Sequence, residues 1–286
     1  MTKLPYQLAM PVDHSSSVIF ASPHSGRIYP ASFLRSSVLD ERIIRTSEDA
    51  FVDLLFEEVP KFGSPLLSAS APRAYLDLNR SAEELDAALI EGMETKIHNP
   101  RVASGLGVVP RVVANGRGIY RGKISLKEAH RRISEVWRPY HDCLQNLMTQ
   151  NTCDFGESIL IDCHSMPHEA IESIHHAGKP HPDVVLGDRF GVAANSGFVD
   201  QIEGAFTKAG LRVARNAPFA GAFIVQHYGR PSRNQHAVQI EIDRSLYMNE
   251  KMIRPNGNFI AFRKLMGQVA ADIIDIGRKK VSLAAE

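Results

Sequence analysis

The sequence predicts an α/β fold, a three-layer sandwich in which helices cover both faces of a mixed, largely parallel sheet. Short apolar runs of strand length alternate along the chain with longer segments whose apolar residues recur at helical spacing. This alternation is typical of sheets whose parallel strands are joined by helices. Several of the apolar runs end in titratable residues, and in α/β folds ligands bind beyond the carboxyl ends of the strands. The same pattern therefore predicts where a site would lie.

The expected elements follow from these apolar runs. Strands are predicted at 17–21, 66–69, 74–78, 159–163, 183–186, 213–216 and 237–242. Helices are predicted over 126–148, 192–209 and 260–276, and over the apolar residues between 51 and 59, which follow the helix-start signature Thr46-Ser47-Glu48-Asp49. The stretch 99–122 is irregular and dense in Gly and Arg, so we expect it to form a wall or lid of the site.

Composition restricts the class of protein. With 286 residues, 44% of them hydrophobic and 23% charged, the chain is expected to form one soluble globular domain over 1–286. The 33 Lys and Arg residues nearly balance the 32 Asp and Glu residues, which gives no reason to expect nucleic acid as a partner. Three cysteines without a CxxC pair, and an N-terminus without a signal-peptide pattern or membrane-spanning stretch, favour the cytoplasm and no membrane partner.

Polar residues at four predicted strand ends suggest a metal site. His24, the pair Asn79-Arg80, His164 and Glu241 each stand at the end of an apolar run. Two histidines and one carboxylate are the usual protein ligands of a catalytic zinc, which lowers the pKa of its water to about 7. His24 and His164 supply the histidines, and either Glu48 or Asp49 supplies the acid. Zinc is expected, although cobalt and manganese accept the same ligands.

The remaining strand-end groups suit hydrolysis. Glu241 lies between isoleucines in a predicted buried strand, where a carboxylate is costly unless it has a purpose, and it could serve as general base. Arg73 and Arg80 could hold a substrate carboxylate or stabilise an oxyanion. Asp162 is expected on the opposite side of its strand from His164, as a buried acid or a support for the ligand. There is no GxSxG elbow for a serine nucleophile and no GxGxxG after a strand for a dinucleotide.

A set of motifs between His14 and Glu250 resembles the N-formylglutamate amidohydrolase family. These are Pro23-His24-Ser25-Gly26-Arg27, Glu48-Asp49-Ala50-Phe51-Val52-Asp53, Asp77-Leu78-Asn79-Arg80, Tyr120-Arg121-Gly122, Asp162-Cys163-His164-Ser165-Met166-Pro167, Gly187-Asp188-Arg189 and Gln239-Ile240-Glu241-Ile242. That family is similar in turn to zinc carboxypeptidases and aspartoacylases. The resemblance therefore implies a phosphorylase/hydrolase-like, zinc carboxypeptidase-like version of the α/β sandwich.

The resemblance also assigns roles. His24 and His164 match the zinc histidines. Carboxypeptidases place their acid three residues after the first histidine, where this chain has Arg27, so the family's recurrent aspartate at the next helix, Asp49, is preferred to Glu48. Asn79 and Arg80 match the pair that binds the substrate carboxylate, Glu241 matches the general base, and Arg73 the carbonyl-polarising arginine. Arg121 or Arg189 could join Arg80 in holding the two carboxylates of glutamate, and Tyr228 is expected to bind substrate beside the acyl group.

The function implied is hydrolysis of the amide of an N-acyl amino acid, with N-formyl-L-glutamate giving formate and L-glutamate in histidine degradation. Two alternatives stay open. One is a zinc hydrolase that acts on another N-acyl amino acid or a small peptide. The other is a metal-free protein that binds a dicarboxylate. The partner expected is a small molecule, and the sequence does not indicate an oligomeric state.

Overall fold

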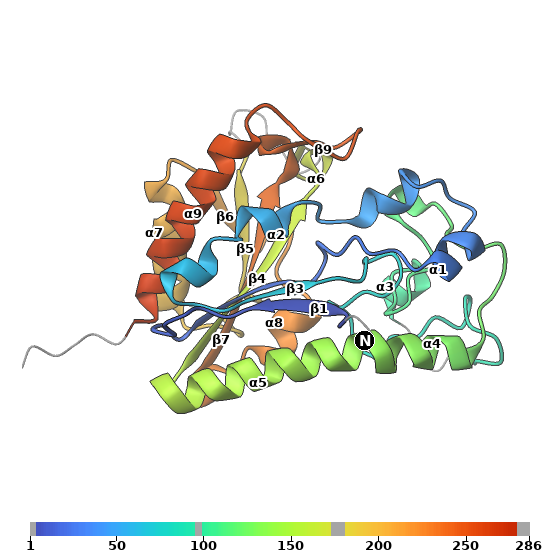
Figure 1. Ribbon diagram of the computed structural model, residues 1–286, viewed down its shortest axis with the longest axis horizontal. Helices are drawn as coiled ribbons and strands as arrows, with labels where there is room; N and C mark the ends of the chain where they lie inside the picture. Colours follow the sequence, from blue (N-terminus) through green and yellow to red (C-terminus); the bar gives the residue numbers. More distant parts are fainter. Residues whose placement is uncertain (1–3, 95–98, 173–180, 279–286) are drawn as a thin grey trace, which may run out of the picture.

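A seven-stranded sheet forms the centre of the computed structural model, which describes residues 4–94, 99–172 and 181–278 (Figure 1). The strands lie in the order β1-β3-β2-β4-β7-β5-β6. Their bounds are β1 Tyr6–Ala9, β2 Val18–Ser22, β3 Leu66–Ala69, β4 Ser158–Met166, β5 Val184–Gly187, β6 Val213–Arg215 and β7 Gln235–Asp243. Strands β3, β2, β4 and β7 run parallel to one another, as do β5 and β6, whereas β1 pairs antiparallel with β3 and β5 pairs antiparallel with β7. The predicted mixed, largely parallel sheet is confirmed.

Helices cover both faces of this sheet and complete the three layers (Figure 1). On one face lie α2 (Val52–Leu55), α7 (Ser196–Lys208) and α9 (Phe259–Ile276), whose apolar residues pack with those of the central strands. On the other face lie α5 (Arg138–Phe155) and α8 (Phe223–Tyr228), with a separate apolar core. Two cores on opposite faces are what strands with nearly continuous apolar sequences require.

Short elements fill the connections. The helices are α1 Ala31–Ser36, α3 Pro100–Ala103, α4 Leu126–Arg132 and α6 His168–Glu172, and the strands β8 Met248–Asn249 and β9 Arg254–Pro255 form a small second sheet. Single helical turns are η1 Ile43–Ser47, η2 Val59–Phe62, η3 Ala114–Gly116, η5 Pro231–Arg233 and η6 Arg244–Leu246. Within the described residues, no helix combines the length and apolarity needed to cross a membrane.

The predicted helix over 126–148 is confirmed and longer than expected. Helix α4 continues through the π-helical turn η4 (Ile133–Trp137) into α5, which ends at Phe155 before Gly156. Its buried residues recur at helical spacing, Tyr140, Leu144, Leu147 and Met148 among them, so one side of the helix packs on the sheet. The expected strands other than 74–78 and the helices at 192–209 and 260–276 are also present within a few residues of their predicted bounds.

Two local predictions were wrong. Residues 74–78 are buried, but they form turns rather than a strand, since the amides of Tyr75 and Leu76 donate to the carbonyl of Pro72. In place of the predicted helix over 51–59 the structure has the short helix α2 and the turn η2, and Phe51, directly before α2, has a left-handed backbone conformation with φ of 69°. The first segment carries Asp77 to the cavity, and the second begins just after Asp49, so both acids lie on or beside irregular backbone.

Gly26 lets two chain segments meet behind His24. A Cβ atom at Gly26 would lie 2.0 Å from the carbonyl oxygen of Ala71, which is far inside contact distance. The next link between these segments is the hydrogen bond from the amide of Ile28 to the carbonyl of Ser70, 3.0 Å long. The loop that follows β2 is therefore fixed against the loop that follows β3 only when residue 26 has no side chain.

We predict that Gly26→Ala lowers the free energy of unfolding by about 2 kcal/mol or more, because the backbone of residue 71 must move to admit the methyl group. Denaturant titration measures this loss. Gly257→Ala is the matched control, since a Cβ atom there meets no atom within 4 Å. Equal stability of the two variants would show that the loops separate without cost.

Candidate active site

A cavity of about 600 Å³ opens at the carboxyl ends of β2, β4 and β7. This is the position that the sequence predicts for a site. The charged and amide side chains that line it are His24, Asp49, Arg73, Asp77, Asn79, Arg80, Arg101, His164, Gln239, Glu241 and Arg244.

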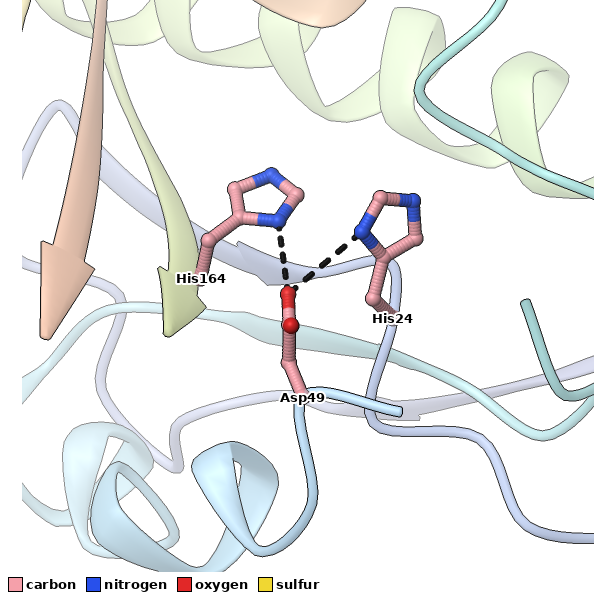
Figure 2. Close-up of side chains that lie close together, drawn as sticks. All are labelled: His24, Asp49 and His164. Atoms are coloured by element: carbon pink, nitrogen blue, oxygen red, sulfur yellow. Dashed lines mark hydrogen bonds and ion pairs between the residues drawn. The ribbon is translucent and has the colours of Figure 1, made fainter. Parts of the chain in front are cut away.

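Three buried side chains converge in this cavity: His24 from the turn after β2, Asp49 from the segment before α2, and His164 from β4 (Figure 2). The Oδ2 atom of Asp49 lies 2.9 Å from Nδ1 of His164 and 3.4 Å from Nδ1 of His24. The amide of Asp49 also donates to the carbonyl of His24 over 3.0 Å, which fixes the two loops together. The sequence predicted that these three residues meet, and the structure brings them together.

The donor set fits a divalent metal ion. One atom each from His24, Asp49 and His164 lies within 4.8 Å of the others, and all three residues are buried. The Nδ1 atom of His24 is buried without a hydrogen-bond partner among the described residues, which is costly unless a ligand occupies it. Burial alone would lower the pKa of His164, but Asp162 and Asp49 raise it well above its ordinary value, so the cluster attracts positive charge.

Each histidine is held by a second carboxylate at its other ring nitrogen. Nε2 of His24 lies 2.7 Å from Asp77, and Nε2 of His164 lies 3.0 Å from Asp162. Both rings therefore turn Nδ1 toward Asp49, in the arrangement that carboxylates impose on metal-binding histidines. The expectation that Asp162 faces away from His164 was wrong, because residues two apart on a strand share a face.

The structure separates the two candidate acids. Glu48 forms an ion pair with Arg45, with N–O distances of 2.9 and 3.0 Å, and accepts a 2.7 Å hydrogen bond from the Tyr29 hydroxyl. Asp49 alone faces the histidines, and its Oδ1 atom accepts a 2.8 Å hydrogen bond from Nη2 of Arg244. Arg244 was not predicted from the sequence, although it directly follows the strand that carries Glu241.

Glu241 lies opposite His164 in the ladder between β4 and β7. Its Oε1 atom accepts a 2.8 Å hydrogen bond from the side chain of Gln239. Burial raises the pKa of Glu241 to about 7, Asp49 adds to the effect, and His164, Arg244 and Arg73 oppose it. A carboxyl group with a pKa near neutrality can both accept and return a proton.

Asn79 and Arg80 line the cavity, but the amide of Asn79 is already occupied. Its Oδ1 accepts from the amide of Ile224 over 2.8 Å, and its Nδ2 lies 3.1 Å from Nε2 of His164. Arg80 donates from Nε to the carbonyl of Leu106 and from Nη1 to that of Asn79. Of the predicted pair, Arg80 is thus the residue with hydrogen-bonding capacity left for a ligand.

Three predicted substrate-binding residues are not brought to the cavity. Arg121 is exposed, and Arg189 lies in a turn after β5 with φ of 55°. The hydroxyl of Tyr228 is buried and lies 3.0 Å from Nδ1 of His141. None of the three lines the cavity. The arginines found there and not predicted are Arg101, which lies far from any strand end, and Arg244, which directly follows β7.

The sequence and the structure both match known proteins. Residues 16–248 match the family described as N-formylglutamate amidohydrolase. N-formylglutamate deformylase of Pseudomonas aeruginosa is 28% identical over 244 residues, which cover 82% of this chain and 83% of that protein. The Pseudomonas putida deformylase is 27% identical over 238 residues, 82% of each chain.

Two crystal structures share the fold. That of N-formylglutamate amidohydrolase from Ralstonia eutropha JMP134 superposes with a TM-score of 0.90 at 34% identity, over 96% of this chain and 99% of the other. A gene product from Agrobacterium tumefaciens gives a TM-score of 0.64 at 16% identity, over 93% and 95% of the two chains. The second match supports the architecture alone.

The raised pKa of Glu241 predicts a pH-dependent effect on stability. The folded-state pKa lies above the unfolded one, so ionised Glu241 destabilises the fold above about pH 7 and the cost disappears below about pH 4. In chelator-treated protein, Glu241→Gln should therefore raise the free energy of unfolding by about 3 kcal/mol at pH 8 and by nothing at pH 4. Denaturant titrations at both pH values measure this, with exposed Glu91→Gln as control. A gain that is equal at both pH values would contradict it.

Proposed function

Because the chain belongs to the N-formylglutamate amidohydrolase family, we propose that it hydrolyses the amide of N-formyl-L-glutamate to formate and L-glutamate. The observation that carries the proposal is the buried set of His24, Asp49 and His164 beside Glu241 in one cavity. The curated relatives are N-formylglutamate deformylases, and this chain and each of them align over more than four-fifths of their lengths.

His24, Asp49 and His164 hold a divalent metal ion, and two histidines with one carboxylate suit zinc. When bound there, zinc supplies a Lewis acid that activates water and polarises the formyl carbonyl. The chain prepares the site by directing both Nδ1 atoms toward Asp49, and Arg244 holds the other oxygen of Asp49 in place.

Glu241 moves the protons of the reaction. It accepts a proton from the attacking water and delivers it to the amide nitrogen, so that the amine leaves neutral. Its buried position and its pKa of about 7 suit both steps. Gln239 holds one of its oxygens, which leaves the other oxygen free to take the proton.

Arg73 and Arg80 bind the substrate. Nε of Arg73 is fixed to Asp77 over 2.9 Å, which leaves the end of its guanidinium for the developing oxyanion. Arg80 holds the α-carboxylate. Asn79 was expected to contact the substrate directly. Its side-chain amide instead positions His164 and the start of α8.

The purified protein loaded with zinc should release formate from N-formyl-L-glutamate, and His164→Ala should lose both bound zinc and formate release. Glu241→Gln should keep the zinc and lose about 10² to 10⁴ in kcat, because general acid–base catalysis is removed. Formate assay and metal analysis check this, and exposed His130→Ala is the control. Full activity of the His164 variant would refute the assigned site.

Asp77 orients His24 over 2.7 Å. Asp77→Asn should weaken zinc binding about 10- to 100-fold, because the amide orients the imidazole less well than the carboxylate. Competition against a chromophoric chelator measures the affinity. Asp53→Asn, which breaks only the pair with half-exposed Arg27, is the control. Unchanged affinity for zinc in the Asp77 variant would show that His24 is oriented without it.

A further inference from the structure

Arg80 is a buried cation without an acidic partner. Its side chain is only 6% exposed, yet it forms no ion pair within the part of the chain that the structure describes. Two of its nitrogens donate to the carbonyls of Leu106 and Asn79, and these bonds fix the guanidinium without neutralising it. Buried charges in proteins are normally paired, so this one is arranged for an anion that comes from outside the chain.

Arg101 places a second free guanidinium at the same cavity. It lies in α3 and lines the cavity, and its side chain has no hydrogen-bond or ion-pair partner among the described residues. Arg73, Arg80 and Arg101 all line this cavity, and burial lowers the pKa of Arg80, with Asp77 and Glu84 opposing that effect and Arg73 and Arg101 adding to it. With Arg73 tied to Asp77, Arg80 and Arg101 remain as two unpaired positive charges.

The loop that carries Arg101 is anchored on both sides of it. Asn99 caps α3 by accepting from the amide of Arg101, and its own amide group donates to Glu84 over 3.1 Å. On the other side, Arg111 pairs with Asp86 over 2.9 Å and donates to the carbonyl of Ala103. These bonds hold α3 beside the cavity before any ligand arrives, which reduces the cost of ordering Arg101 on binding.

We propose that Arg101 binds the side-chain carboxylate of the substrate and is the residue that makes the enzyme specific for an acidic N-formyl amino acid. The proposal rests on the function inferred above and adds the second of two carboxylate sites, with Arg80 taking the α-carboxylate. Arg101 thus takes the role that the sequence predicted for Arg121 or Arg189, neither of which lines the cavity.

The depth at which each arginine lies in the cavity indicates which substrate carboxylate it binds. The α-carboxylate is attached to the carbon that bears the amide nitrogen, so it must lie close to the reacting bond. Arg80 is buried and follows Asn79, whose amide touches His164. The side-chain carboxylate lies two methylenes farther out, and Arg101 is exposed at the cavity wall on a separate loop. The inner carboxylate is therefore assigned to the buried arginine and the outer one to the exposed arginine.

The test compares N-formyl-L-glutamate with N-formyl-L-glutamine, which has a neutral amide in place of the side-chain carboxylate. In Arg101→Gln, kcat/KM for the glutamate substrate should fall about 10- to 100-fold, mainly through KM, because one charge-assisted contact is lost. The value for the glutamine substrate should not change. The preference of the wild-type protein should also shrink as salt is added, since Arg101 is exposed.

Arg117→Gln is the matched control, because Arg117 is exposed on the same loop and lines a neighbouring cavity instead. A calorimetric titration with L-glutamate and L-glutamine gives a second readout that needs no turnover. The proposal would be overturned if Arg101→Gln released formate normally, kept the wild-type preference between the two substrates and bound glutamate as tightly as the wild type. A different outcome would overturn only the proposed reaction. In that case the wild type releases no formate, yet Arg101→Gln still binds glutamate more weakly, and Arg101 remains the carboxylate site.

Discussion

One buried carboxylate, that of Asp49, connects the parts of this site. Its two oxygens face His24, His164 and Arg244, which come from the turn after β2, from β4 and from η6 after β7. Removing one partner from a buried charge typically costs about 3 to 5 kcal/mol, so the positions of these segments depend on one another. The left-handed residue Phe51 and the broken helix around it are the local irregularities that bring Asp49 to this point.

The register between β4 and β7 supplies the second constraint. Asp162 pairs with Gln239 and His164 with Glu241, so the polar residues of both strands share one face near their carboxyl ends. The residues between them, such as Cys163 and Ile240, face the core formed with α2, α7 and α9. A shift by one residue would bury the polar set in that core, and the sheet therefore fixes both the fold and the position of the site.

Site residues could be predicted from the sequence where a titratable residue stands at or near the end of an apolar, strand-like run. His24, His164 and Glu241 follow apolar runs, and the resemblance to a family selected Asp49. Residues on irregular backbone were harder to place. The apolar run before Asn79 has the composition of a strand but turns at Pro72, and that turn brings Asp77 under His24. Likewise Arg101 and Arg244 gain their positions from tertiary contacts, whereas Arg121 and Arg189 lie in motifs that the fold leaves outside the cavity.

The two oxygens of Asp77 are divided between different tasks. Oδ1 holds His24 at 2.7 Å, and Oδ2 holds Arg73 at 2.9 Å. One carboxylate thus touches both a residue of the proposed metal site and a residue proposed to bind the substrate. If binding of the ion changes the affinity for substrate through this carboxylate, thermodynamic linkage requires that binding of substrate change the affinity for the ion by the same factor. The occupancy of the enzyme by its ion would accordingly depend on how much substrate is present.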